Sequence, residues 1–204
     1  MTLKAYYIWF VENWAKAGVI LGIFLTIYLV EVVLPQNVLL FALMMYTPLY
    51  TLHEAEEYVF PGGFAEFVNR NIYKANPENG LLDTTAIFWI NMVVWFFFPL
   101  SGFQAITNLD AAGWMPYFVI FQAVVHLAIG IAGKRFFNPG MYTAWLVHVP
   151  WAIWTIWLLM KAGAIVNPYW NGYLQAGLLI NLAFPVAGFM LWVRYKRKLR
   201  GQKG

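Results

Sequence analysis

The stretch of sequence that decides the fold is residues 37–60, NVLLFALMMYTPLYTLHEAEEYVF, an apolar run that ends in one histidine and three glutamates. A charged side chain at membrane depth costs several kcal/mol, so such a cluster needs a specific reason. At about 100° per residue, His53, Glu56 and Glu57 fall within one third of a helix circumference. We therefore expect these three side chains to point at one object, and we expect Glu54 to point elsewhere and lie at the membrane interface.

The composition of the whole chain places this stretch in an integral membrane protein. Of 204 residues, 62% are hydrophobic, 20% are aromatic and only 11% are charged, and the mean hydropathy is +0.62. Soluble domains have a clearly lower apolar fraction, about 45–50%. The chain has no cysteine, which excludes disulfides, cysteine metal sites and a thiol nucleophile. Any metal would have to be held by His, Glu, Asp or Asn.

Apolar runs and helix-breaking residues predict an all-α, polytopic membrane bundle that forms a single domain, 1–204. Pro35 ends the first apolar run, and Pro61-Gly62-Gly63 ends the second. The aromatic segment Tyr6 to Trp14 suits either an interfacial helix before the first span or an extension of that span, and we expect the interfacial helix. The six predicted transmembrane helices are 18–34, 37–60, 84–103, 114–133, 141–161 and 170–193, followed by a basic tail, 194–204.

The distribution of lysine and arginine predicts the orientation of these spans. With six spans, every Lys and Arg except Lys161 falls on the side of the two termini, and six of the 13 lie in the tail. The positive-inside rule therefore predicts cytoplasmic N- and C-termini. A short basic tail beside a membrane is typical of lipid head-group contact rather than nucleic-acid binding. We expect membrane lipid and a hydrophobic small molecule as partners, and the sequence leaves the oligomeric state open.

The same orientation predicts that the three histidines share one layer of the bundle. With a rise of about 1.5 Å per residue, His53, His126, His148 and Asn91 all come out roughly 10 Å from the cytoplasmic face. A second tier of polar groups is expected just deeper. It comprises Gln122, one turn from His126, and Asn181. Because polar groups at this depth must face the bundle interior, we expect Asn91, Gln122 and Asn181 to form interhelical hydrogen bonds or to line a pocket.

The spacing of the cluster favours a metal site. His53 and Glu57 are spaced i, i+4, the spacing by which one helix presents two ligands to one ion. We expect His126, from another helix, to complete the ligand set, and we expect His148, from a third helix, to be either a ligand or a hydrogen-bond partner of a ligand. A shell of nitrogen and oxygen suits zinc or iron, and the sequence does not separate the two metals. Glu56 would then be free to act as the general acid or base.

A structural interpretation of the same run stays open. Adjacent carboxylates at a membrane edge often pair with basic residues of neighbouring loops. The candidates for such pairs are Arg70, Lys74, Lys134 and Arg135.

The order of the motifs resembles the HXXEE-domain family of integral membrane proteins, whose function is uncharacterised. The resemblance rests on His53-x-x-Glu56-Glu57, on a later histidine matched best by His126, and on Phe137-Asn138-Pro139-Gly140. That family is described by an HXXEE motif, a second histidine and a YxPG motif, so Phe137 stands where the family has tyrosine. The resemblance covers predicted spans two to five, and it implies one functional unit that includes His53, Glu56, Glu57, His126, Pro139 and Gly140.

Three functions agree with these residues. The first is a membrane-embedded, metal-dependent enzyme, most directly a hydrolase, that acts on a lipid-like substrate. The second is a metal-free enzyme in which His53 and the glutamates shuttle protons, as in isomerisation or cyclisation of a sterol- or isoprenoid-like substrate. The third is a transporter that uses the cluster as an ion site. A covalent serine nucleophile is not expected, because Ser101, the single serine, is predicted near the outer side.

Overall fold

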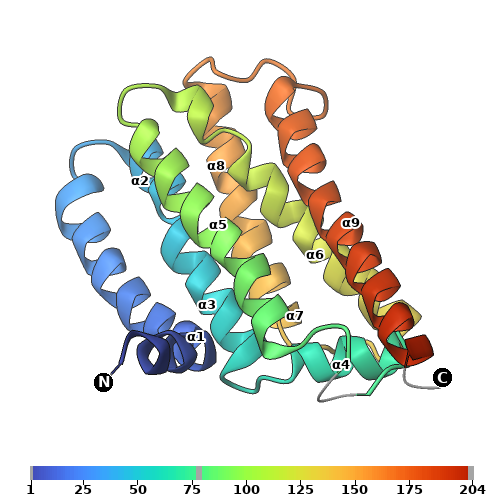
Figure 1. The fold of residues 1–204 in the computed structure, drawn as a ribbon. Coiled ribbons are helices and arrows are strands. Elements are labelled where there is room, and N and C mark those ends of the chain that lie inside the picture. Colours follow the sequence, from blue (N-terminus) through green and yellow to red (C-terminus); the bar gives the residue numbers. More distant parts are fainter. Residues whose placement is uncertain (1, 77–79, 202–204) are drawn as a thin grey trace.

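The chain folds into a bundle of helices in a computed structural model that describes residues 2–76 and 80–201. The main helices are α1 (Leu3–Tyr28), α2 (Val38–Met44), α3 (Tyr46–Tyr58), α4 (Phe64–Asn71), α5 (Thr84–Gln104), α6 (Met115–Ala132), α7 (Met141–Thr143), α8 (Val149–Lys161) and α9 (Gly172–Gly201). Two π-helical turns, Leu29–Val33 and Ala144–His148, and a 3₁₀ turn, Leu109–Ala111, join or extend them. The described residues contain no strand, so the predicted all-α bundle is confirmed (Figure 1).

Five helical segments of the described chain are long and apolar enough to cross a membrane, which indicates a membrane protein. They are Leu3–Val33, Thr84–Gln104, Leu109–Ala132, Met141–Lys161 and Gly172–Arg200. The prediction of six such spans fails at 37–60, which forms the two short helices α2 and α3 with an interruption at Met45. Pro48 accounts for the interruption, because it has no N–H to donate to the carbonyl of Met44.

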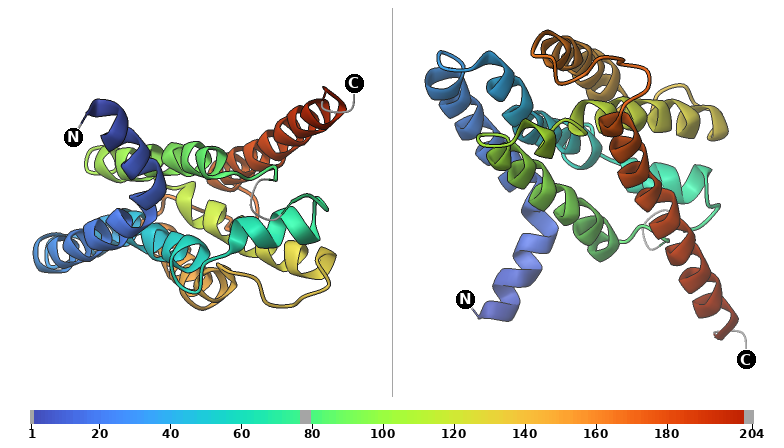
Figure 2. Two further views of the ribbon diagram at one scale, coloured as in Figure 1. Left: turned by 60° about the horizontal axis from the view of Figure 1, so that its bottom comes forward. Right: turned by 90° about the horizontal axis from the view of Figure 1, so that it is seen from above.

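Helix α3 lies inside the bundle. It contacts α1, α4, α5 and the start of the α7–α8 segment (Figures 1 and 2). Its buried residues include five polar or charged ones, Thr51, His53, Glu54, Glu56 and Glu57. Because protein rather than lipid surrounds the helix, these side chains can find hydrogen-bond partners at membrane depth.

The N-terminal segment is part of α1 and does not form a separate interfacial helix. Helix α1 is continuous, but its first half turns away from its second half at the end of the bundle where the N-terminus lies (Figure 2). Trp14 fixes this segment to the core, because its ring lies 5.4 Å from the ring of Tyr58 and 5.7 Å from that of Trp95. The predicted separate helix is therefore corrected to a bent extension of the first span.

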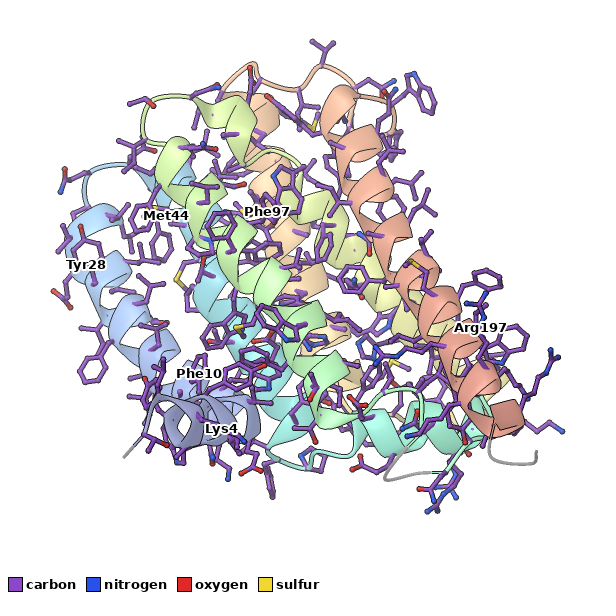
Figure 3. The ribbon with its side chains drawn as sticks, in the orientation of Figure 1. Lys4, Phe10, Tyr28, Met44, Phe97 and Arg197 are labelled. Atoms are coloured by element: carbon purple, nitrogen blue, oxygen red, sulfur yellow. The ribbon has the colours of Figure 1, made fainter. Side chains whose placement is uncertain are left out.

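Both termini lie at the same end of the bundle (Figure 1). Lys4 and Arg197 are found toward this end, whereas Tyr28 lies toward the other (Figure 3). Helix α4 is also at the end with the termini (Figure 1). Lys161, the one basic residue that the sequence assigned to the other side, is the last residue of α8.

Close packing of α1 on α3 and α5 generates a stability prediction. A Cβ added at Gly18 would lie 2.5 Å from Cζ2 of Trp95, a contact too short for any real side chain. We expect Gly18→Ala to destabilise the protein by about 1–3 kcal/mol through overpacking. Thermal unfolding in detergent measures the change.

The control is Gly172→Ala, at the start of α9, where an added Cβ meets no atom within 4 Å. Its effect should stay within about 0.5 kcal/mol. A Gly18→Ala variant more stable than the wild type, as expected for an unhindered glycine in a helix, would show that the packing is looser than described.

Candidate metal centre

Helices α3 and α6 bring two imidazoles and one carboxylate to a single point inside the bundle. Nε2 of His53 lies 3.7 Å from Oε1 of Glu57, and Nε2 of His126 lies 3.3 Å from the same oxygen. The three residues are buried, and each offers a ligand atom within 4.8 Å of the other two. Such a group of two nitrogens and one oxygen could hold a single metal ion.

Asn138 orients the ring of His126. Nδ2 of Asn138 donates to the backbone carbonyl of His126 over 2.9 Å, and Oδ1 of Asn138 lies 2.7 Å from Nδ1 of His126. Because an amide oxygen only accepts, Nδ1 must be the protonated ring nitrogen. The lone pair of Nε2 on the neutral ring is then directed toward Glu57, as in a metal-binding histidine held by an outer hydrogen bond.

Thr143 orients the ring of His53 in the same way. The hydroxyl of Thr143 donates to Oε2 of Glu56 over 2.6 Å, and it lies 2.8 Å from Nδ1 of His53. Since the hydroxyl proton is used on the carboxylate, Thr143 accepts from Nδ1–H of His53. The second imidazole therefore also presents the lone pair of Nε2 to the cluster.

Glu56 binds the first turn of the helical segment 141–161. Its carboxylate accepts from the backbone N–H of Tyr142 over 3.1 Å, from the backbone N–H of Thr143 over 2.7 Å, and from the Thr143 hydroxyl. A carboxylate is favoured at this position, because the first N–H groups of a helix lack partners within the helix. The carboxylate that the sequence assigned to proton transfer thus lies in a hydrogen-bond network that positions Thr143, and through it His53.

His148 joins the layer of histidines but lies outside the three-residue group. Its ring centroid is 5.0 Å from that of His53, and its Nε2 donates to the carbonyl of Leu49 over 3.1 Å. Nδ1 of His148 is buried and has no hydrogen-bond partner among the described residues. His148 ends a π-helical turn that precedes Pro150, whose missing N–H interrupts the normal ladder. The predicted layer of three histidines is present. His148 is the histidine of this layer that lies outside the group of possible ligands.

Gly140 closes the cluster on one side, and only glycine fits there. Its φ is +92°, and a Cβ at this position would lie 2.5 Å from Cε1 of His126 and 2.9 Å from both Cγ of Glu57 and Cε1 of His53. Glycine permits both the left-handed backbone and the close approach. The ring of Phe64 lies 5.3 Å from that of His126. The backbone at Gly140 therefore covers this side of the cluster.

The three amides predicted at this depth, Asn91, Gln122 and Asn181, are all buried. Nδ2 of Asn91 donates to the carbonyl of Ile87 over 2.9 Å, within its own helix. Nδ2 of Asn181 donates to the carbonyl of Phe118 over 3.1 Å and so joins α9 to α6. Gln122 is buried on α6, one turn before His126. None of these three amides belongs to the group of possible metal ligands.

Glu54 differs from its sequence prediction. Its side chain is fully buried rather than interfacial, with Nε1 of Trp95 donating to Oε2. Oε1 of Glu54 has no partner among the described residues. The carboxylate does point away from His53 and Glu57, as predicted, toward α5. The burial results from α1 and α5 covering this face of α3, which the spacing of residues within α3 cannot indicate.

Two functional residues were not identified from the sequence. Asn138 and Thr143 orient the two imidazoles, and both lie in or just after the motif Phe137-Asn138-Pro139-Gly140. Their polarity next to that motif was the available signal. Phe137, at the family's tyrosine position, is 38% exposed and packs on Tyr142 with 4.6 Å between ring centroids, so it has no hydroxyl to offer the cluster.

Comparison with known proteins agrees with the resemblance seen in the sequence. The family model described as "Protein of unknown function with HXXEE motif" matches residues 44–155, a range that includes α3, α6 and the segment that orients both imidazoles. No curated protein matches the chain, and no solved structure does. Because the match covers more than half of the chain, this protein belongs to the HXXEE family.

Proposed function

We propose that this protein is a membrane-embedded, metal-dependent enzyme that acts on a lipid-like or other hydrophobic substrate, most directly as a hydrolase. One observation supports it above all. His53, Glu57 and His126 converge on one point, and both imidazoles have their other nitrogen fixed by a hydrogen bond. This arrangement is typical of a metal centre, in which each ligating imidazole has its other ring nitrogen held by an outer hydrogen bond.

Two of the three distances between donor atoms fit a small divalent ion. Two ligands at about 2.1 Å from a tetrahedral ion lie about 3.4 Å apart. The distances from Oε1 of Glu57 to the two Nε2 atoms are 3.3 Å and 3.7 Å. Two histidines and one carboxylate form the ligand set of hydrolytic zinc sites and also that of non-haem iron sites. Zinc or iron is therefore the proposed metal, and zinc suits the hydrolytic function.

The residues around the donors have distinct proposed roles. A bound divalent metal would supply Lewis-acid activation of water and of a carbonyl or phosphoryl oxygen. Asn138 and Thr143 keep the ligating nitrogens in place, and Glu56 positions Thr143. His148 is the group able to accept a proton, because its Nδ1 has no hydrogen-bond partner among the described residues and lies outside the proposed ligand set. A substrate would reach the donors by displacing the covering segment at Pro139 and Gly140, at the end of the bundle that contains the termini.

A metal-free function has support from one contact. Nε2 of His126 and Oε1 of Glu57 are 3.3 Å apart, close enough for direct proton exchange between them. An acid–base isomerase or cyclase would use that pair. The metal content of the purified protein separates the two functions.

For the topology, we propose that α2 and α3 together form a sixth, interrupted crossing and that both termini are cytoplasmic. The common end of the termini and the position of Lys161 at the other end support this orientation. The chain has no cysteine, so single cysteines can be introduced and labelled with a membrane-impermeant maleimide. Lys161→Cys should react in intact cells and Lys198→Cys only after lysis. The reverse pattern would refute the orientation.

Metal content tests the proposed function most simply. The wild-type protein should contain about one zinc or iron per chain by elemental analysis, because three protein ligands suffice for a catalytic site. Glu57→Gln and His126→Ala should each lose most of the metal. His148→Ala is the matched control, since it removes a buried imidazole outside the ligand group and should retain the metal.

Two results would count against the metal. The first is a folded wild-type protein without zinc or iron after reloading. The second is equal metal in His126→Ala and His148→Ala.

The outer hydrogen bonds provide a separate prediction. Thr143→Val keeps the side-chain shape and removes the hydroxyl that holds His53, so metal affinity should fall about 10- to 100-fold. Competition with a chelator measures the affinity. Thr155→Val is the control, because the Thr155 hydroxyl donates to the carbonyl of Trp151 within α8 and touches no ligand. If both variants bind metal as the wild type does, Thr143 does not orient a ligand.

A further inference from the structure

A long groove lies between α5 and α9, away from the histidine cluster. It consists of two adjoining cavities of about 860 Å³ and 290 Å³ that share Trp89, Ile90 and Ala187 in their walls. Helices α5 and α9 lie side by side in front of α6 (Figures 1 and 2). The groove therefore runs lengthwise along the bundle and opens toward the membrane.

The packing of α9 explains why the groove exists. Helix α9 packs closely on α6, where a Cβ added at Gly177 would lie 2.9 Å from the backbone of Phe118 and Trp114. Asn181 strengthens this contact by its hydrogen bond to the carbonyl of Phe118. Because α9 packs on α6, the adjacent face of α9 lies opposite α5. The groove separates these two helices.

The two ends of the groove differ in chemistry. Phe97, Phe98, Trp114 and Phe118 line the smaller cavity, which is almost entirely apolar. Arg194 and Lys198, spaced i, i+4 on α9, line the larger cavity at the end with the C-terminus. Asp83 also lines this end, but its carboxylate accepts from the backbone N–H of Ala86 over 2.8 Å as a helix cap. The groove is thus an apolar channel with a basic end.

The groove is separate from the metal centre. Phe98 and Phe118 form its floor, and on their other side both rings face Tyr50, at centroid distances of 5.0 Å and 6.3 Å. Tyr50 in turn lies 5.7 Å from the ring of His53. A layer of aromatic rings therefore divides the groove from the cluster.

We propose that this groove binds an anionic membrane lipid, with its phosphate at Arg194 and Lys198 and its acyl chain along the aromatic floor. Charge complementarity identifies the head group, because two cations at the membrane surface attract an anionic lipid. The length of the groove indicates an acyl chain as the apolar part of the ligand. From Arg194 to Ile180 the groove follows α9 for about 21 Å, which exceeds the roughly 15 Å of one leaflet's hydrocarbon. The proposal does not depend on the metal centre.

Native mass spectrometry of the full-length protein tests the proposal. The probes are phosphatidylglycerol and phosphatidylcholine with identical acyl chains. The wild type should retain phosphatidylglycerol in preference to phosphatidylcholine. Arg194→Gln with Lys198→Gln should weaken that retention by about 10- to 30-fold, because two direct contacts to the phosphate are lost.

The matched control is Lys196→Gln with Arg197→Gln, which removes the same charge from the same helix at residues that do not line the groove. It should change retention by no more than about twofold. A second variant, Ala187→Trp, fills the point where the cavities join and should lower retention of both lipids. Thermal unfolding checks that each variant is folded.

Three outcomes would overturn the proposal. Equal loss in the two double variants would show that only the overall charge of the tail matters. Equal retention of the two lipids by the wild type would remove the head-group preference. Competition by glycerol phosphate as effective as by the lipid would show that the apolar channel takes no part.

Discussion

Burial of the ionisable face of α3 is the constraint on which the rest of the structure depends. Away from water, each buried polar atom needs a partner within the protein. His53 finds Thr143, and Glu56 finds the backbone at the start of the segment 141–161. These contacts join residues almost ninety positions apart and hold the beginning of α7–α8 against α3. The bundle is therefore assembled around its most polar helix.

The segment 137–143 follows from the same constraint. Asn138 provides an oxygen for the ring of His126, and Gly140 allows the backbone to pass within contact of both imidazoles. Thr143 then links one imidazole to Glu56. Each residue type in this segment has a specific task, since a Cβ at residue 140 would collide with the site and an apolar residue at 138 would leave His126 unoriented. This gives a physical reason for the motif that the family resemblance indicated.

Much of the candidate site was predictable from the sequence, because depth follows from helix rise and orientation. The arithmetic placed the histidines in one layer, and the rings of His53 and His126 are 4.9 Å apart. Helix periodicity also predicted correctly that Glu57 points toward the histidines and that Glu54 points away from them. It could not show which faces of α3 are covered, so the burial of Glu54 against Trp95 was missed. That contact depends on tertiary packing across 41 positions of the chain.

The prediction of one continuous span over 37–60 was wrong, and the hydrogen-bond partners of Glu56 were not predicted, for different reasons. Hydropathy averages over a window and does not register the break at Met45 that follows from Pro48. The role of Glu56 depends on where a distant helix begins, because the N–H groups of Tyr142 and Thr143 bind its carboxylate. Motif spacing identifies a set of ionisable residues. The partner that each of them binds depends on residues that approach from other helices.

We propose that His53, Glu57 and His126 ligate one metal ion inside the bundle. X-ray absorption at the edge of the bound metal tests it most directly. We expect a shell of nitrogen and oxygen at about 2.0–2.2 Å with the scattering pattern of two imidazoles, reduced to one in His126→Ala. A shell without imidazole scattering, or a spectrum unchanged in His126→Ala, would contradict it.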